Sequence, residues 1–122
     1  MYNKAKEILL YEDHFEELSE RSDEVDIKTQ MKEIREIVSA IKHTMEKNDL
    51  KILSAPYIGF KKRIFCIAFK EEIKTFINPI IAHAEDIQLS RETDCTLPGK
   101  SYIRPRNSKI DIIYQRPTGQ TE

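Results

Sequence analysis

The chain has 122 residues, enough for one domain, because two halves would each be too small to bury a core. Its 20 basic and 21 acidic side chains nearly cancel, so the overall charge favours neither nucleic acid nor a membrane as a partner. No apolar stretch is long enough to span a membrane, and the opening residues 1–6 lead into acidic sequence rather than a secretory signal. We therefore expect one cytoplasmic domain over residues 1–122, with reduced thiols at Cys66 and Cys95.

The first third of the chain predicts an acidic arm followed by one helix. Residues 6–25 carry many Glu and Asp with scattered apolar residues, which indicates a surface arm with short helical or irregular pieces. Apolar residues then recur at alternating spacings of four and three, at Ile27, Met31, Ile34, Val38, Ile41 and Met45. We expect Asp26 as the N-cap and a stop at Asn48 and Asp49. With fewer than three heptads, packing on the chain's own domain is favoured over a coiled coil.

The remainder of the chain predicts strands. The segment Ile-Leu-Ser-Ala-Pro-Tyr-Ile-Gly-Phe at 52–60 separates the helix from a buried strand at 63–69. Further strands are expected at 74–77, interrupted by Asn78 and Pro79, at 80–89 as an edge strand, and at 110–114, with a turn at 116–119. A helix followed by strands without βαβ alternation predicts an α+β fold with a mostly antiparallel or mixed sheet.

Candidate metal ligands and nucleophiles are few. Neither a C-x-x-C nor an H-x-x-x-H spacing is present, and the available side chains are His14, His43, His83, Cys66 and Cys95. Cys66 lies in an apolar run and is interpreted as a buried small hydrophobe. His14 and His43 are interpreted as surface residues, and His83 could face either way. Cys95, between polar residues and a turn, could be a reactive or metal-bound thiol.

Two local basic clusters do not change the assessment of nucleic acid. They comprise residues 61–63 and a second group formed by Lys100, Arg104, Arg106 and Lys109. The chain as a whole is not basic, so we expect no nucleic-acid partner.

The order of these features resembles that of the peptide deformylase family. The helix is followed by Leu53-Ser-Ala-Pro-Tyr-Ile-Gly59, a Lys-Arg-Ile-Phe strand, Phe-Ile-Asn-Pro79 and Glu-Thr-Asp-Cys-Thr-Leu-Pro-Gly99. The family's first motif has the form G-Φ-G-L-A-A-x-Q, its second E-G-C-L-S, and its third H-E-x-x-H on a C-terminal helix. The agreement extends from residue 27 to residue 114.

The resemblance implies a metal-dependent amide hydrolase that acts in protein synthesis. The second-motif cysteine and two third-motif histidines would hold Fe²⁺ or another divalent metal with an open position for water. The third-motif glutamate would handle protons, and the first-motif glutamine would stabilise the oxyanion. The reaction would remove the formyl group from the N-terminal methionine of nascent chains, whose backbone would bind as an added strand.

Several positions depart from the family's pattern. The two glycines of the first motif fall on Leu50 and Ile52, and the glutamine falls on Tyr57. In the second motif, an ungapped register places Asp94 at the metal-ligand position, whereas a one-residue gap places Cys95 there. No H-E-x-x-H occurs in the 122 residues, so the C-terminal motif helix is absent from them.

We therefore expect a deformylase-like domain that is catalytically incomplete and needs no cofactor by itself. The walls of any remaining pocket are expected from Leu53, Ser54, Ala55, Tyr57, Gly59 and residues 95–97, which include Thr96 and Leu97. Such a pseudoenzyme would bind the N-terminal peptide of nascent chains, or a protein partner or second copy over the uncovered sheet face. The alternatives are a truncated or divergent deformylase that retains activity, and a remnant that merely folds.

Overall fold

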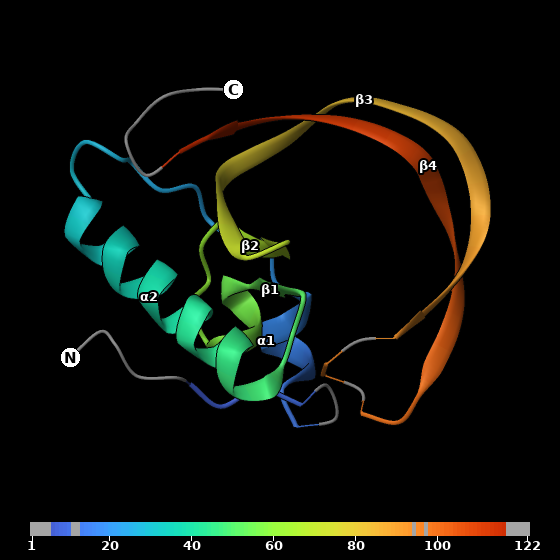
Figure 1. Cartoon of the computed structure of the whole chain (residues 1–122), viewed down its shortest axis with the longest axis horizontal. Coiled ribbons are helices and arrows are strands. Elements are labelled where there is room, and N and C mark those ends of the chain that lie inside the picture. Colours follow the sequence, from blue (N-terminus) through green and yellow to red (C-terminus); the bar gives the residue numbers. More distant parts are fainter. Residues whose placement is uncertain (1–5, 11–12, 94, 97, 117–122) are drawn as a thin grey trace.

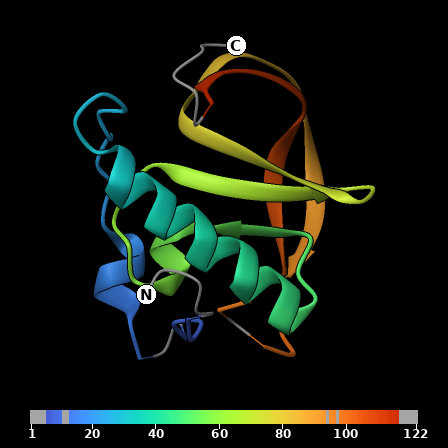
Figure 2. The same cartoon turned by 60° about the vertical axis from the view of Figure 1, so that its left-hand side comes forward.

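The structure is a computed structural model that describes residues 6–10, 13–93, 95–96 and 98–116. Its elements are α1 (Phe15–Ser19), α2 (Met31–Asn48), β1 (Ile52–Ser54), the 3₁₀ helix η1 (Ala55–Ile58), β2 (Ile64–Phe69), β3 (Glu72–Thr93) and β4 (Ser101–Gln115). The strands form one antiparallel sheet in the order β1-β2-β3-β4. Helix α2 packs against β1, β2 and η1 (Figures 1 and 2).

The predicted α+β class, with a helix on an antiparallel sheet, is confirmed. No helix in the described ranges has the length and apolar character needed to cross a membrane.

Helix α2 ends where predicted but begins later. Asp26 is not its N-cap, because its carbonyl accepts hydrogen bonds from the N–H groups of Thr29 and Gln30 in a preceding turn. The Asp26 side chain also belongs to this turn and accepts from Lys28 N–H at 3.0 Å. Gln30 is the N-cap residue and makes no side-chain capping bond. At the other end, Asp49 adopts a left-handed conformation with φ 52°, which terminates the helix as predicted.

The predicted apolar stripe of α2 forms the centre of the hydrophobic core. Ile34 and Ile41 are fully buried, and the core also contains Leu53, Ile64 and Ile77 from three strands. Burial of such side chains is the main favourable contribution to folding. The helix therefore packs on its own domain, as the short heptad run predicts.

Cys66 on β2 lies within this core, as predicted for a small hydrophobe. Its side chain is fully buried, and its Sγ lies 3.5 Å from Thr75 Oγ1. Burial raises the pKa of the Cys66 thiol, and the Thr75 hydrogen bond opposes the shift in part. No disulfide joins Cys66 and Cys95.

The predicted break at Pro79 does not occur. β3 runs from Glu72 to Thr93 and pairs first with β2 and then with β4. A bulge makes this possible, since the register with β4 jumps from Ile77 to Ile80 and leaves Asn78 and Pro79 out of the ladder. Pro79 consequently needs no N–H group for pairing. The predicted strands at 74–77 and 80–89 are thus one strand.

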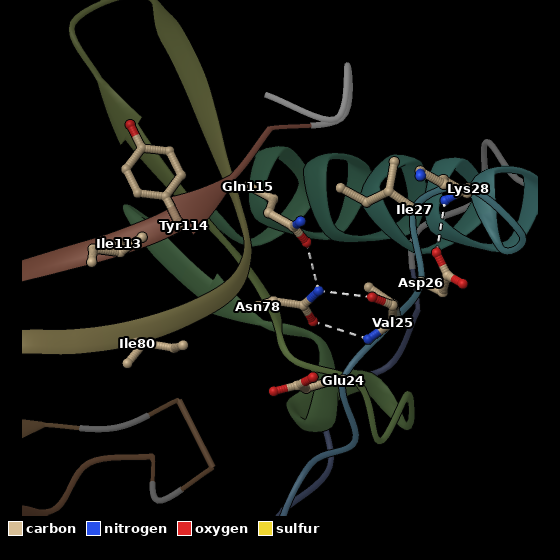
Figure 3. Close-up of a pocket in the computed structure, with 10 residues that line it drawn as sticks. All are labelled: Glu24, Val25, Asp26, Ile27, Lys28, Asn78, Ile80, Ile113, Tyr114 and Gln115. Carbon is tan, nitrogen blue, oxygen red and sulfur yellow. Dashed lines mark hydrogen bonds between the residues drawn. The ribbon is translucent and has the colours of Figure 1, made fainter. Parts of the chain in front are cut away.

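The Asn78 side chain holds the bulge against the acidic arm (Figure 3). Its Nδ2 donates to Val25 O at 2.7 Å and to Gln115 Oε1 at 2.8 Å, and its Oδ1 accepts from Val25 N–H at 2.9 Å. The Asn78 N–H donates to Arg63 O at 2.8 Å. Asn78 also has φ 51°, a left-handed conformation that Asn tolerates better than most residues.

The acidic arm lies on the surface, as its composition predicts. It contains the short α1 and irregular segments, and Val25 near its end is buried. Lys61 Nζ lies 3.0 Å from a Glu20 carboxylate oxygen, and Arg63 Nη1 lies 3.1 Å from Glu24. The arm is therefore fixed to the segment between η1 and β2.

Strands β3 and β4 extend beyond the core as a long two-stranded ribbon, which arches away from α2 (Figure 1). β4 spans Ser101–Gln115, much longer than the predicted 110–114. At the far end of the ribbon, Cys95 packs against the core and Thr96 is buried. The predicted turn at 116–119 lies mostly outside the described residues.

Replacing Asn78 tests the role of the bulge. The Asn78→Gly variant keeps the left-handed backbone but loses three hydrogen bonds, so we expect a loss of roughly 2–4 kcal/mol in unfolding free energy. Asn78→Ala should lose about 1 kcal/mol more, because alanine is strained at positive φ. The measurement is urea unfolding followed by circular dichroism.

Asp86→Gly is the matched control, since Asp86 also has positive φ on β3 but is exposed. Its stability should change by less than about 1 kcal/mol. Equal effects at positions 78 and 86 would contradict a special role for the Asn78 hydrogen bonds.

Alkaline pH should destabilise the chain through Cys66. Because burial raises the pKa of this thiol in the folded state, the unfolded state loses its proton first as the pH rises through about 9. The unfolding free energy should then fall by up to about 1.4 kcal/mol per pH unit from this group. Urea unfolding at pH 8 and pH 10 should show a smaller decline for Cys66→Ala; an identical decline would contradict the prediction.

Candidate functional site

Residues 52–60 form a strand end and a single 3₁₀ turn on the surface of the core. Pro56 lies in the first turn of η1, where its missing N–H costs nothing. The turn closes at Gly59, whose φ of 95° favours glycine. Gly59 N–H donates to Pro56 O at 3.2 Å, and Phe60 N–H donates to Ala55 O at 3.1 Å. The Ala-Pro and Ile-Gly pairs of the sequence thus specify the shape of this loop.

The side chains predicted to line a pocket differ in accessibility. Leu53 and Ala55 are fully buried in the hydrophobic core. They could therefore contact a ligand only through their main-chain groups. Ser54 is half-buried at the end of β1, opposite Phe65 of β2, and Gly59 is exposed.

The two positions predicted to correspond to motif glycines carry large side chains. Ile52 is 56% exposed on β1, and Leu50 packs partly buried against the core. β1 pairs with β2 on one side, and no strand of the described residues pairs with its other side. The Ile52 side chain therefore stands at the open edge of the sheet.

Tyr57, predicted to occupy the position of the motif glutamine, is half-buried and packs against the core. Its carbonyl accepts a hydrogen bond from Leu9 N–H at 2.8 Å. This bond ties the start of the acidic arm to η1, a contact that the sequence pattern did not reveal.

The second predicted segment reaches the same core from the far end of the ribbon. Cys95 is half-buried and packs against the same core as Tyr57, and Thr96 is buried. Asp94 and Leu97 lie outside the described residues, so the two registers at Asp94 and Cys95 stay predictions. The fold therefore brings the two motif segments onto one core despite their separation in sequence.

The histidines do not join Cys95. His43 is exposed on α2, as predicted, and its Nδ1 donates to Ser39 O at 2.7 Å. His83 is exposed on β3, and its Nε2 donates to a Glu85 carboxylate oxygen at 2.6 Å. His14 is half-buried in the arm.

The described residues do not form a donor set for a catalytic divalent metal. No three His, Cys, Asp or Glu residues within the described ranges are grouped closely enough to hold one. A catalytic site for such a metal ordinarily needs three protein ligands and an open position.

A separate hollow lies between the end of the acidic arm and the base of the ribbon (Figure 3). It has a volume of about 520 Å³, and its walls include Val25, Asn78, Ile80, Ile113 and Tyr114. Sequence reasoning missed it, because Asn78 and Pro79 were interpreted as the end of a strand. Two local features shape this hollow. Helix α2 begins only after Asp26, and β3 contains a bulge at Asn78.

Comparison with known proteins agrees with the predicted fold. A family model described as polypeptide deformylase matches residues 5–122. No curated protein sequence matches the chain. Among solved structures, the peptide deformylase of Thermotoga maritima is 22% identical, with a TM-score of 0.84, and the match covers 97% of this chain and 78% of that one.

Two further structures contain bound ligands. The peptide deformylase of Synechococcus elongatus, in complex with actinonin, is 22% identical with a TM-score of 0.83. The match covers 96% of this chain but only 63% of the Synechococcus chain. The class I type b enzyme of Acinetobacter baumannii, bound to Met-Ala-Ser, is 14% identical with a TM-score of 0.85, over 98% of this chain and 82% of that one.

The structural likeness at these identities establishes the fold, and the family model extends over nearly all of the sequence. Together with the order of the helix, the loop at 52–60 and the Cys95 segment, this match shows that the chain belongs to the polypeptide deformylase family.

Proposed function

We propose that residues 1–122 form a single deformylase-family domain that binds a peptide or protein segment without hydrolysing it. The observation that carries this proposal is the ligand set. The family's chemistry requires a metal held by one cysteine and two histidines, and the motif positions in these residues supply one ligand, Cys95 or, in the ungapped register, Asp94. One thiolate cannot hold a catalytic divalent metal with an open position for water.

The altered first motif supports the same proposal. Tyr57 replaces the glutamine that would stabilise an oxyanion, and its half-buried side chain packs on the core. A phenol has a different length from an amide side chain and presents one donor rather than two. The oxyanion contact of the family is therefore changed along with the metal ligands.

The open edge of β1 is the proposed seat for a peptide. An extended peptide can add to such an edge through main-chain hydrogen bonds, and the N-terminal peptide of nascent chains is the ligand class that the family implies. The Acinetobacter relative binds Met-Ala-Ser. In this chain Ile52 adds a β-branched side chain where a glycine would allow close approach, so we expect weak binding.

A second candidate is a divergent, metal-dependent deformylase whose remaining ligands lie outside these 122 residues. The coverage favours it, because the match spans 63% of the Synechococcus chain and 78% of the Thermotoga chain. In that case the complete site would hold Fe²⁺ or another divalent metal. Translating the nucleotide sequence beyond codon 122 in three frames tests this, and an H-E-x-x-H codon run would favour it.

An activity assay separates the two candidates. Residues 1–122 supplied with Fe(II), Ni(II) or Co(II) should release no formate from a formyl-methionyl peptide above the metal-only background, because two ligands and the general base are missing. Formate measured by a coupled dehydrogenase is the readout. Turnover that is lost in Cys95→Ala would contradict the proposal and support the active enzyme.

Peptide titration tests binding itself. Formylated and unformylated Met-Ala-Ser should bind with dissociation constants within about threefold of one another, because no metal selects the formyl group. Ile52→Gly should tighten binding of both by roughly fivefold or more, by removing the side chain at the edge. Isothermal titration calorimetry is the measurement.

Ile110→Gly is the control, because Ile110 is similarly exposed but lies on β4, away from β1. It should leave both dissociation constants unchanged. If neither peptide binds the original chain or Ile52→Gly at millimolar concentration, peptide binding is removed from the proposed function.

A further inference from the structure

We propose that the β3–β4 ribbon is a dimer interface, on which a second copy of this chain packs. The ribbon exposes large apolar side chains that a compact domain would cover. Ile87 and Leu89 are 74% and 78% exposed, and Ile80, Ile103 and Ile113 are each about half exposed. Exposed clusters of this kind mark interaction surfaces.

These five side chains lie on one face of the ribbon. β4 keeps regular alternation, so Ile103, Asn107 and Ile113 point to the same side. Their cross-strand partners are on that side as well, because paired residues of antiparallel strands share a face. The register pairs Ile80 with Ile113 and Ile87 with Asn107, and Leu89 follows two residues later.

The order of side chains along this face is apolar, charged, apolar. The proximal cluster is Ile80 and Ile113, and the distal cluster is Ile87, Leu89 and Ile103. Between them lie two registered polar pairs, His83 with Asp111 and Glu85 with Lys109.

This order suits a two-fold axis through the charged band. Two ribbons that cross in opposite directions then place each proximal cluster against the partner's distal cluster, and each charged band against the other. Each contact between the two copies then occurs twice, with the roles of the copies exchanged, which defines an isologous interface. The band contains both signs of charge, so it complements a second copy of itself better than a strongly acidic or basic partner.

The hollow at the base of the ribbon provides a recess into which the partner's side chains can pack. Ile80 and Ile113 form part of its wall, beside Val25 and Tyr114, and its volume of about 520 Å³ can receive branched aliphatic side chains. In the proposed dimer, Leu89 and Ile87 of one copy enter the hollow of the other.

Light scattering after size exclusion, over a range from about 1 to 100 µM, tests the proposal. The expected mass is twice 14.4 kDa. Leu89→Glu should raise the dimer dissociation constant at least about 100-fold, because it places a charge in an apolar contact. The control is Ile81→Glu, which makes the same change at a 63% exposed residue of the same strand. Ile81 pairs with Ile112 of β4, so both lie on the opposite face of the ribbon. This variant should change the dimer dissociation constant less than about threefold.

Cysteine pairing tests the two-fold arrangement. A mixture of Leu89→Cys and Ile113→Cys chains should form a disulfide-linked dimer under mild oxidation, at several times the yield of either variant alone. Far-UV circular dichroism confirms that each variant is folded. A monomer throughout the concentration range overturns the proposal and leaves the ribbon to a different polypeptide, and a dimer equally insensitive to Leu89→Glu and Ile81→Glu also overturns it.

Discussion

The hydrogen bonds of the Asn78 side chain are the constraint on which the rest of the structure depends. They hold the arm at Val25 and the end of β4 at Gln115 against one bulge. Because of this bulge, a single strand leaves the core sheet and continues as the ribbon with β4. The ribbon in turn carries the Cys95 segment back to the core. An asparagine supplies both the donor–acceptor pair and the tolerance of positive φ that this position requires.

The chain retains the family's fold, while its loop at 52–60 departs from the family's first-motif pattern. The loop at 52–60 keeps the residues that shape the backbone, since Pro56 opens η1 and Gly59 closes it. At the positions predicted to act on a substrate, the loop carries Ile52, which lies at the sheet edge, and Tyr57, which packs against the core. Packing requirements are met by many interchangeable apolar side chains, whereas a metal site needs particular atoms at particular points. A fold therefore tolerates more substitution than a metal site does.

The sequence predicted the elements whose signals are local. The stripe on α2, the burial of Cys66 and the antiparallel α+β class follow from periodicity and element order. Asp26 was wrongly predicted as the N-cap, because its hydrogen bonds close a turn that depends on Gln30. The break at Pro79 was also wrong, since a bulge is stabilised by Val25 and Gln115, which are remote in sequence. The candidate site is a prediction from motif order, and the burial of Leu53 and Ala55 within it emerged only with the packing.

The change of partner along β3 also divides the chain into two regions of local stability. Residues 72–77 pair with β2 and lie next to the buried core, whereas residues 80–90 lie in the part of β3 that pairs only with β4, and they are largely exposed. Local opening costs least where few apolar contacts must be broken. Amide hydrogens of the ribbon can therefore exchange with solvent by separation of two strands, while those beside α2 exchange through far larger unfolding events. The boundary between these two exchange regimes is the peptide group of Asn78 and Pro79.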